Sequence, residues 1–163
     1  MKTIAKFIAL GLCSAAIALT GCRGKQDISS SYSLFKFDTT CVSNNGDGTQ
    51  TLRAWGTGPS IDVAIEQAKK NAVNDVIFKG IPGEKGCSQQ PIVTEVNGRE
   101  RYEEYFDRFF SDGGEYSNFV YETSSKDRSR VKSKSNSREN YGVIVTVKRS
   151  ALRDQLRQDG VIK

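Results

Sequence analysis

The sequence predicts an α+β domain of two layers, in which a mainly antiparallel sheet is covered by helices on one face. Three observations support this class. Extended stretches with alternating apolar and polar residues come in two pairs, within 34–56 and 115–148. Two helical patterns separate the pairs and a third closes the chain, so the expected order is β-β-α-α-β-β-α. Strands joined by a tight turn pair antiparallel, and a helix with one apolar stripe buries it against a sheet.

The first 22 residues have the order of a secretory signal. Two lysines form a charged start, and an apolar run at 7–19 follows, too short for a stable membrane span. Leu19–Cys22 reads Leu-Thr-Gly-Cys and resembles the bacterial lipobox, whose cysteine carries a diacylglycerol. We therefore expect a lipoprotein signal peptide at 1–21 and a lipid anchor with several acyl chains, such as palmitate, on Cys22. The alternative is an ordinary signal peptide cleaved elsewhere, with this cysteine free or in a disulfide.

The region after the leader begins as a tether and continues as the first hairpin. Residues 22–33 are polar, with three consecutive serines, which indicates a flexible linker to a single domain at 34–163. Residues 34–43 alternate between apolar and polar, and 49–56 resume an extended pattern. The Asn-Asn-Gly-Asp-Gly run at 44–48 is a strong turn signal, so these two strands form a hairpin.

A long amphipathic helix is expected next. Ser60 is a good N-cap, apolar residues recur at three- and four-residue spacing, and Gly80 followed by Pro82 ends the pattern. A narrow stripe of alanines lets this helix approach a sheet closely: Ala64, Ala68 and Ala72.

The Gly-Thr-Gly at 56–58 stands where a nucleotide-binding loop would stand. The dinucleotide fingerprint needs its third glycine at position 61, which is Ile61, and Pro59 lacks a backbone donor for a phosphate. We therefore interpret both glycines as a tight turn between strand and helix.

The second helix is expected at about 99–111, after a loop at 82–96 that becomes extended towards its end. Its aromatic stripe is typical of core, although a ligand or carbohydrate platform is the alternative: Tyr102, Tyr105, Phe106, Phe109 and Phe110. Its carboxylates are interpreted as a solvated face rather than an acid/base pair: Glu100, Glu103, Glu104 and Asp107.

The second half of the sheet and the last helix complete the domain. Strands are expected at 115–123 and 140–148. A closing helix from Ser150 turns Leu152 and Leu156 inward and ends at Gly160.

The cysteines and the absence of histidine limit the chemistry. Cys13 lies in the leader, so Cys41 and Cys87 remain as a pair in an oxidising compartment and favour a disulfide, with two buried free thiols as the alternative. The sequence contains no histidine and no third free thiolate, so we predict no metal site and no cofactor. Ser-His and Cys-His nucleophile systems are excluded and a Ser-Lys pair has no marked position, so we predict no enzyme.

A basic segment is the surface feature that points to a ligand. The formal net charge of the whole chain is +5, and residues 124–138 by themselves carry a net charge of +5. Its cations occupy even positions, so an extended hairpin would present them on one face: Lys126, Arg128, Arg130, Lys132, Lys134 and Arg138. Such a ladder could bind anionic lipid headgroups, acidic glycan or an acidic protein, or could only solubilise a sheet edge. Nucleic acid is not an expected partner.

The chain resembles a group of small Bacteroidales outer-membrane lipoproteins of unassigned function. The resemblance lies in 51–81, including Ala-Trp-Gly-Thr-Gly at 54–58, and continues through 105–110, 113–116 and 152–162. The Gly-x-Gly followed by an alanine-spaced helix is more distantly similar to domains of flagellar and curli assembly lipoproteins. This second similarity implies an assembly-accessory role. Surface-exported lipoproteins of this group carry an acidic stretch after the cysteine, whereas residues 23–27 are largely basic, which implies the periplasmic side.

The sequence thus predicts a non-enzymatic, lipid-anchored envelope protein at the outer membrane, facing the periplasm. Its expected role is structural, or that of an assembly accessory that binds a protein partner. The alternative is a binder of anionic lipid or glycan through residues 126–138.

Overall fold

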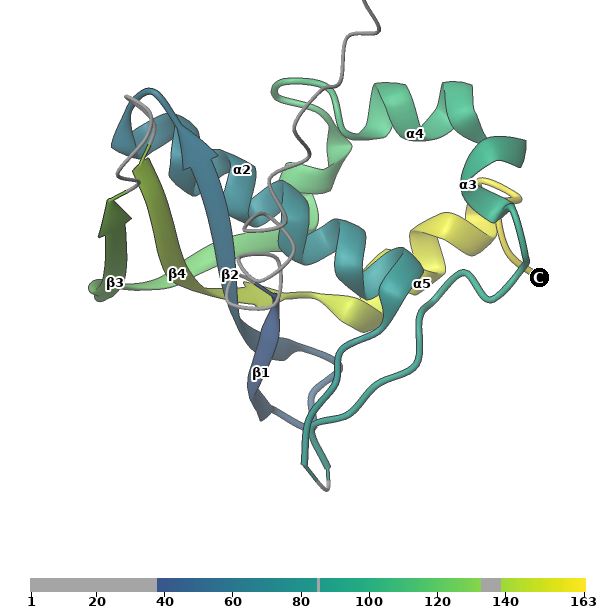
Figure 1. Cartoon of the computed structure of the whole chain (residues 1–163). Helices are drawn as coiled ribbons and strands as arrows, with labels where there is room; N and C mark the ends of the chain where they lie inside the picture. The colour runs from purple at the N-terminus through teal and green to yellow at the C-terminus, as the bar shows by residue number, and fades with distance from the viewer. Residues whose placement is uncertain (1–37, 85, 133–138) are drawn as a thin grey trace, which may run out of the picture.

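The computed structural model describes residues 38–84, 86–132 and 139–163, and it confirms the α+β class (Figure 1). The described elements follow the predicted order of strands and helices, with short π and 3₁₀ segments in addition. They are β1 (Thr40–Asn44), β2 (Gln50–Gly58), α2 (Ile61–Asn74), η2 (Asp75–Lys79), α3 (Gly98–Arg101), α4 (Glu103–Phe109), η3 (Glu115–Phe119), β3 (Val120–Lys132), β4 (Glu139–Val147) and α5 (Arg149–Gln158).

The four described strands form one antiparallel sheet in the order β1-β2-β4-β3. Helix α2 lies across β2 and β4, and α3, α4 and α5 gather to the right of the sheet in Figure 1. The strand residues that face the helices are fully buried: Leu52, Ala54, Val143, Val145 and Val147. Within the described part of the chain, no helix is both long enough and apolar enough to cross a membrane.

Helix α2 packs directly against the backbone of β2. A Cβ on Gly56 would lie 2.0 Å from the carbonyl oxygen of Ala64 and 2.4 Å from the backbone nitrogen of Ala68. Both glycines of the Gly-Thr-Gly run belong to β2, so they are not the tight turn that the sequence suggested. Their small size instead lets the alanine stripe touch the strand. Only Pro59 and Ser60 connect the two elements, and the hydroxyl of Ser60 caps the helix by accepting the N–H of Val63.

The predicted long helix changes geometry before it ends at Gly80. Residues 75–79 form a π-helical turn, closed by the N–H of Gly80 donating to the carbonyl of Asp75 at 2.8 Å. The carbonyls of Val76 and Ile77 are thereby available to accept the N–H groups of Ile92 and Val93, at 3.2 and 2.9 Å. These two bonds, rather than a strand, hold the segment that the sequence predicted as extended.

Two other elements differ from expectation. The second helix is broken at Tyr102, whose backbone angles of −115° and 31° are not helical, so α3 and α4 replace one helix. Residues 115–119 form a 3₁₀ turn instead of the start of a strand. The turn buries Tyr116 and Phe119 together, because residues three apart lie on one side of such a turn. The closing helix is confirmed, with Leu152 and Leu156 fully buried.

Candidate functional site

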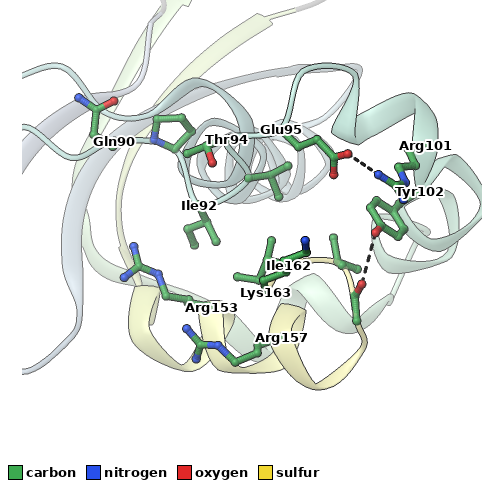
Figure 2. Close-up of a pocket in the computed structure, with 14 residues that line it drawn as sticks. Gln90, Ile92, Thr94, Glu95, Arg101, Tyr102, Arg153, Arg157, Ile162 and Lys163 are labelled. Carbon is green, nitrogen blue, oxygen red and sulfur yellow. Dashed lines mark hydrogen bonds and ion pairs between the residues drawn. The ribbon is translucent and has the colours of Figure 1, made fainter.

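A groove of about 720 Å³ lies between α5, the segment that follows the π turn, and the short helix α3 (Figure 2). Its size is within the range of ligand pockets in proteins, roughly 300–1,000 Å³. The residues that line it come from four parts of the chain: Gln90–Glu95, Arg101–Tyr102, Arg153 and Arg157 of α5, and Gly160–Lys163. The groove is thus assembled by tertiary structure.

The two walls of the groove differ in charge. On one side Arg153 and Arg157 rise from α5, one helical turn apart, as Figure 2 shows. Arg157 pairs with the exposed Asp154 at 3.0 Å, whereas Arg153 has no ion-pair partner within the described ranges. On the other side, Glu95 and Arg101 neutralise each other in an ion pair. The excess of positive charge therefore belongs to the α5 wall.

Arg149, one turn before Arg153, adds a buried charge behind this wall. Its side chain is 8% exposed. One guanidinium nitrogen donates to the carbonyl of Gln90, which lines the groove, and Nη1 has no hydrogen-bond partner among the described residues. Burial lowers the pKa of Arg149, and the charge of Arg153 lowers it further. A cation in this position is stabilised by any anion that enters the groove nearby.

The rest of the lining is mixed, with Gln90, Thr94 and the cation Lys163 beside a well-fixed apolar part. Ile92, Val93 and Val161 are buried and form the base of the groove. The hydroxyl of Tyr102 donates to the carbonyl of Gly160 at 3.3 Å, which joins α3 to the C-terminal segment (Figure 2). The N–H of Val161 donates to the carbonyl of Leu156 at 2.9 Å. The groove is therefore preformed and needs little reorganisation to accept a ligand.

Sequence reasoning missed this groove. A signal was present, because arginines at 149, 153 and 157 are spaced by four residues and lie along one side of a helix. The opposing wall had no such signal, since Ile92 and Val93 reach the site only through their hydrogen bonds to the π turn.

The basic segment includes an irregularity in the pairing of β3 with β4. The hairpin itself is confirmed up to Lys132 on β3 and from Glu139 on β4. However, Ser124 is in register with Ile144 and Ser129 with Gly142, so five steps along β3 match two along β4. Such an irregularity inserts residues into one strand and shifts its alternation.

The single cationic face stays a prediction. The backbones of Arg130 and Lys132 are both in register with odd positions of β4. Lys126 and Arg128 are exposed within the irregular part. Lys134 and Arg138 lie outside the described residues.

Arg128 is already engaged within the fold. Its Nε and Nη2 donate to the two carboxylate oxygens of Glu122 at 2.7 and 2.8 Å. These hydrogen bonds lower the pKa of Glu122. A guanidinium that is already paired with a carboxylate binds an external anion less strongly than an unpaired one. Arg128 is therefore a weaker anion-binding residue than the sequence predicted.

The aromatic stripe of the second helix belongs mainly to the core, as predicted. Phe106 and Phe109 are each 2% exposed, and the three other aromatics of the stripe are partly buried against the core cluster. The carboxylates on the opposite side of the helix are exposed, as a solvated face should be: Glu100, Glu103, Glu104 and Asp107.

Truncation of the buried aromatic Phe106 should be strongly destabilising. Its ring packs edge-on against Phe78 with centroids 4.7 Å apart, so Phe106→Ala leaves a cavity. We expect a loss of about 3–5 kcal/mol in the free energy of unfolding, measured by urea denaturation. Tyr121→Ala is the control, because this ring is 48% exposed and its loss should cost less than about 1 kcal/mol. A near-neutral Phe106→Ala would restore the platform interpretation.

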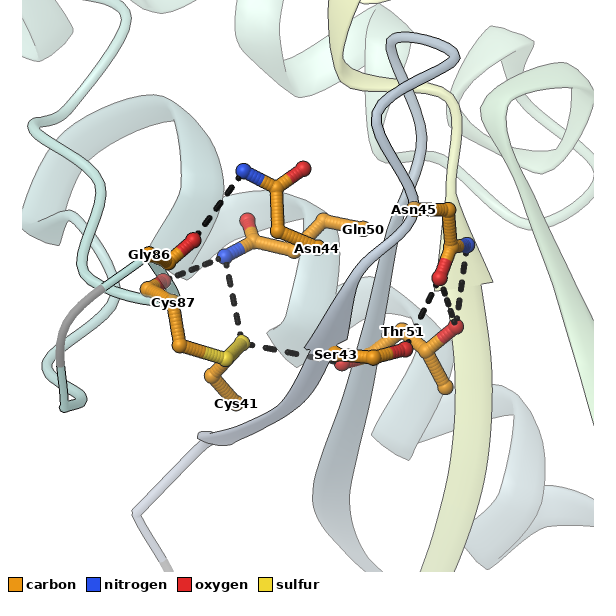
Figure 3. Close-up of a disulfide and its surroundings, with 8 residues drawn as sticks. All are labelled: Cys41, Ser43, Asn44, Asn45, Gln50, Thr51, Gly86 and Cys87. Atoms are coloured by element: carbon orange, nitrogen blue, oxygen red, sulfur yellow. Dashed lines mark hydrogen bonds between the residues drawn. A yellow bond between two sulfur atoms is a disulfide. The ribbon is translucent and has the colours of Figure 1, made fainter.

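Cys41 and Cys87 are joined by a disulfide, which confirms the predicted pair (Figure 3). Their Cα atoms are 5.9 Å apart, and the bond ties β1 to the loop after the π turn. Gln50 and Asn44 reinforce this link by donating to the carbonyls of Cys87 and Gly86, at 2.9 and 3.1 Å. The residues that the structure describes contain no group of His, Cys, Asp or Glu arranged to hold a metal ion.

Comparison of this chain with protein-family models, with curated proteins and with solved structures found no match.

Proposed function

We propose that this protein is a non-enzymatic, lipid-anchored component of the cell envelope that acts as a structural or assembly accessory by binding a protein partner. The observation that carries the proposal is the groove beside α5, which combines a buried apolar base with a wall of arginines in which Arg153 has no ion-pair partner among the described residues. A preformed recess of this kind serves recognition, and its mixture of apolar and charged lining is typical of protein interfaces.

Sequence features support the envelope and the absence of catalysis. The leader at 1–21 and Cys22 favour export and lipid attachment, and the basic residues at 23–27 favour the periplasmic side of the outer membrane. The chain has no histidine for a nucleophile–base pair. The alternative function, binding of anionic lipid or glycan through 126–138, is supported by the exposure of Lys126 and Arg128.

Site-specific photo-crosslinking in intact cells tests the proposal. A photoreactive residue is placed at Thr94 in the groove, at Lys126 in the basic segment, or at the exposed Ser111 as a control. We expect one discrete protein adduct from Thr94 and none from the other two positions. No adduct from Thr94, or a lipid adduct from Lys126 instead, would contradict the proposed function.

A further inference from the structure

The charge distribution in the groove restricts where an anionic group can bind. Glu95 on one wall repels a second carboxylate, although its own charge is paired with Arg101. On the other wall Arg153 has no partner within the described ranges, and Arg157 has only an exposed contact to Asp154. An anionic group therefore belongs on the α5 side, and the opposite side suits a neutral or donor group.

Arg149 increases the preference for an anion at that side. The residue is 8% exposed, its Nη1 is fully buried, and it forms no ion pair with any residue that the structure describes. A buried charge acts through surroundings that screen it less than water does. Because Arg149 holds the carbonyl of Gln90, it also fixes the edge of the groove next to Arg153.

The apolar part of the lining indicates what accompanies the anionic group. Pro91, Tyr102 and Ile162 are half-buried, so each leaves part of an apolar surface facing the groove. Figure 2 shows Tyr102 on the side away from Arg153, with Ile162 between them. A ligand that contacts both the arginines and the apolar surface needs a carboxylate and an apolar group a few ångströms apart. A polypeptide with alternating acidic and apolar residues has this arrangement.

We propose that the groove binds an acidic segment of the partner protein, with a carboxylate held by Arg153 and Arg157 and a neighbouring apolar side chain on Tyr102 and Ile162. The inference rests on the proposed function, because it takes the partner to be a protein. Guanidinium groups match carboxylates in paired hydrogen bonds. A flat anionic membrane fits less well, since the groove is recessed and has Glu95 on its other wall.

A peptide-binding measurement on the full-length lipoprotein in neutral detergent tests this inference. The probe is a fluorescein-labelled peptide of alternating leucine and glutamate, and its counterpart has glutamine in place of glutamate. We expect the glutamate peptide to bind at least about tenfold more tightly than the glutamine peptide. Equal binding of the two peptides would overturn the proposal.

Substitutions of the groove arginines test where the glutamate peptide binds. The double variant Arg153→Gln/Arg157→Gln should weaken binding of the glutamate peptide by about tenfold or more, since two charge-assisted contacts are lost. Arg149→Met should weaken it by about threefold or more, since it removes a nearby positive charge and the hydrogen bond to the carbonyl of Gln90. Arg108→Gln is the matched control, because it removes an exposed arginine from α4, outside the groove, and should leave affinity unchanged.

Two further ligands test whether the groove binds a free anion or an anionic membrane instead of an acidic protein segment. Inorganic phosphate that displaces the peptide at equal concentration would indicate a free-anion site and overturn the proposal. Phosphatidylglycerol vesicles that bind only when Arg153 is present would overturn it in favour of a membrane. If Thr94 forms a protein crosslink in cells but the protein binds no acidic peptide, this inference alone is wrong. If Thr94 forms no crosslink, the proposed function is wrong as well.

Discussion

Gly56→Ala is expected to abolish the native fold or to cost more than about 5 kcal/mol of stability, beyond the usual range for a single substitution. The added methyl would lie 2.0 Å from the carbonyl oxygen of Ala64 and 2.4 Å from the backbone nitrogen of Ala68. Both are backbone atoms of α2, so no side-chain rotation relieves the clash. The helix would have to move away from β2 and open the core between Ala68 and Ala54.

The measurement is urea unfolding of the oxidised protein, followed by circular dichroism. Thr57→Ala is the control, because it changes the next residue of the same strand at an exposed position. It should unfold within about 1 kcal/mol of the wild type. A Gly56→Ala protein with wild-type stability would show that α2 does not contact the strand at this distance, and the account of the Gly-Thr-Gly run would then be wrong.

The sequence predicted a helix or strand correctly wherever one periodic pattern extended over the whole element. Ser60, the alanine stripe and Gly80 define the first helix because cap, packing face and end signal all agree. The break at Tyr102 and the 3₁₀ turn at 115–119 could not be predicted from the sequence. At 115–119 the burial of Tyr116 and Phe119 overrides a continuous local pattern, and at Tyr102 the hydroxyl is bonded to the distant carbonyl of Gly160.

The candidate site was harder to predict from local sequence patterns than the fold. Its arginine wall lies on one helix and has a four-residue spacing, so sequence alone can suggest it. Its other wall depends on a π turn whose carbonyls accept bonds from Ile92 and Val93, residues about fifteen positions later. No local pattern predicts that contact. The register shift between Ser124 and Ser129 could not be predicted for a related reason, because it is set by pairing with β4.

The lipid anchor has the largest expected effect on the protein in cells. Cys22 lies outside the described residues, so the prediction stands on the Leu-Thr-Gly-Cys sequence alone. One acyl chain gives only reversible membrane binding, with an association constant of about 10⁴ M⁻¹, whereas several chains give a stable anchor. Cys22→Ala removes the acceptor for all of them. The protein should therefore move almost completely from the membrane pellet to the soluble or precursor fraction.

Cys13→Ala is the matched control, because it removes a cysteine from the leader and should change neither fractionation nor mature mass. Intact mass spectrometry supplies the second readout, since only the wild type and this control should carry the added lipid. Unchanged fractionation of Cys22→Ala, with no mass difference from the wild type, would end the lipoprotein interpretation. If Cys22→Ala is soluble, its Thr94 crosslink should also weaken, because a tether holds the groove at high local concentration beside an envelope partner.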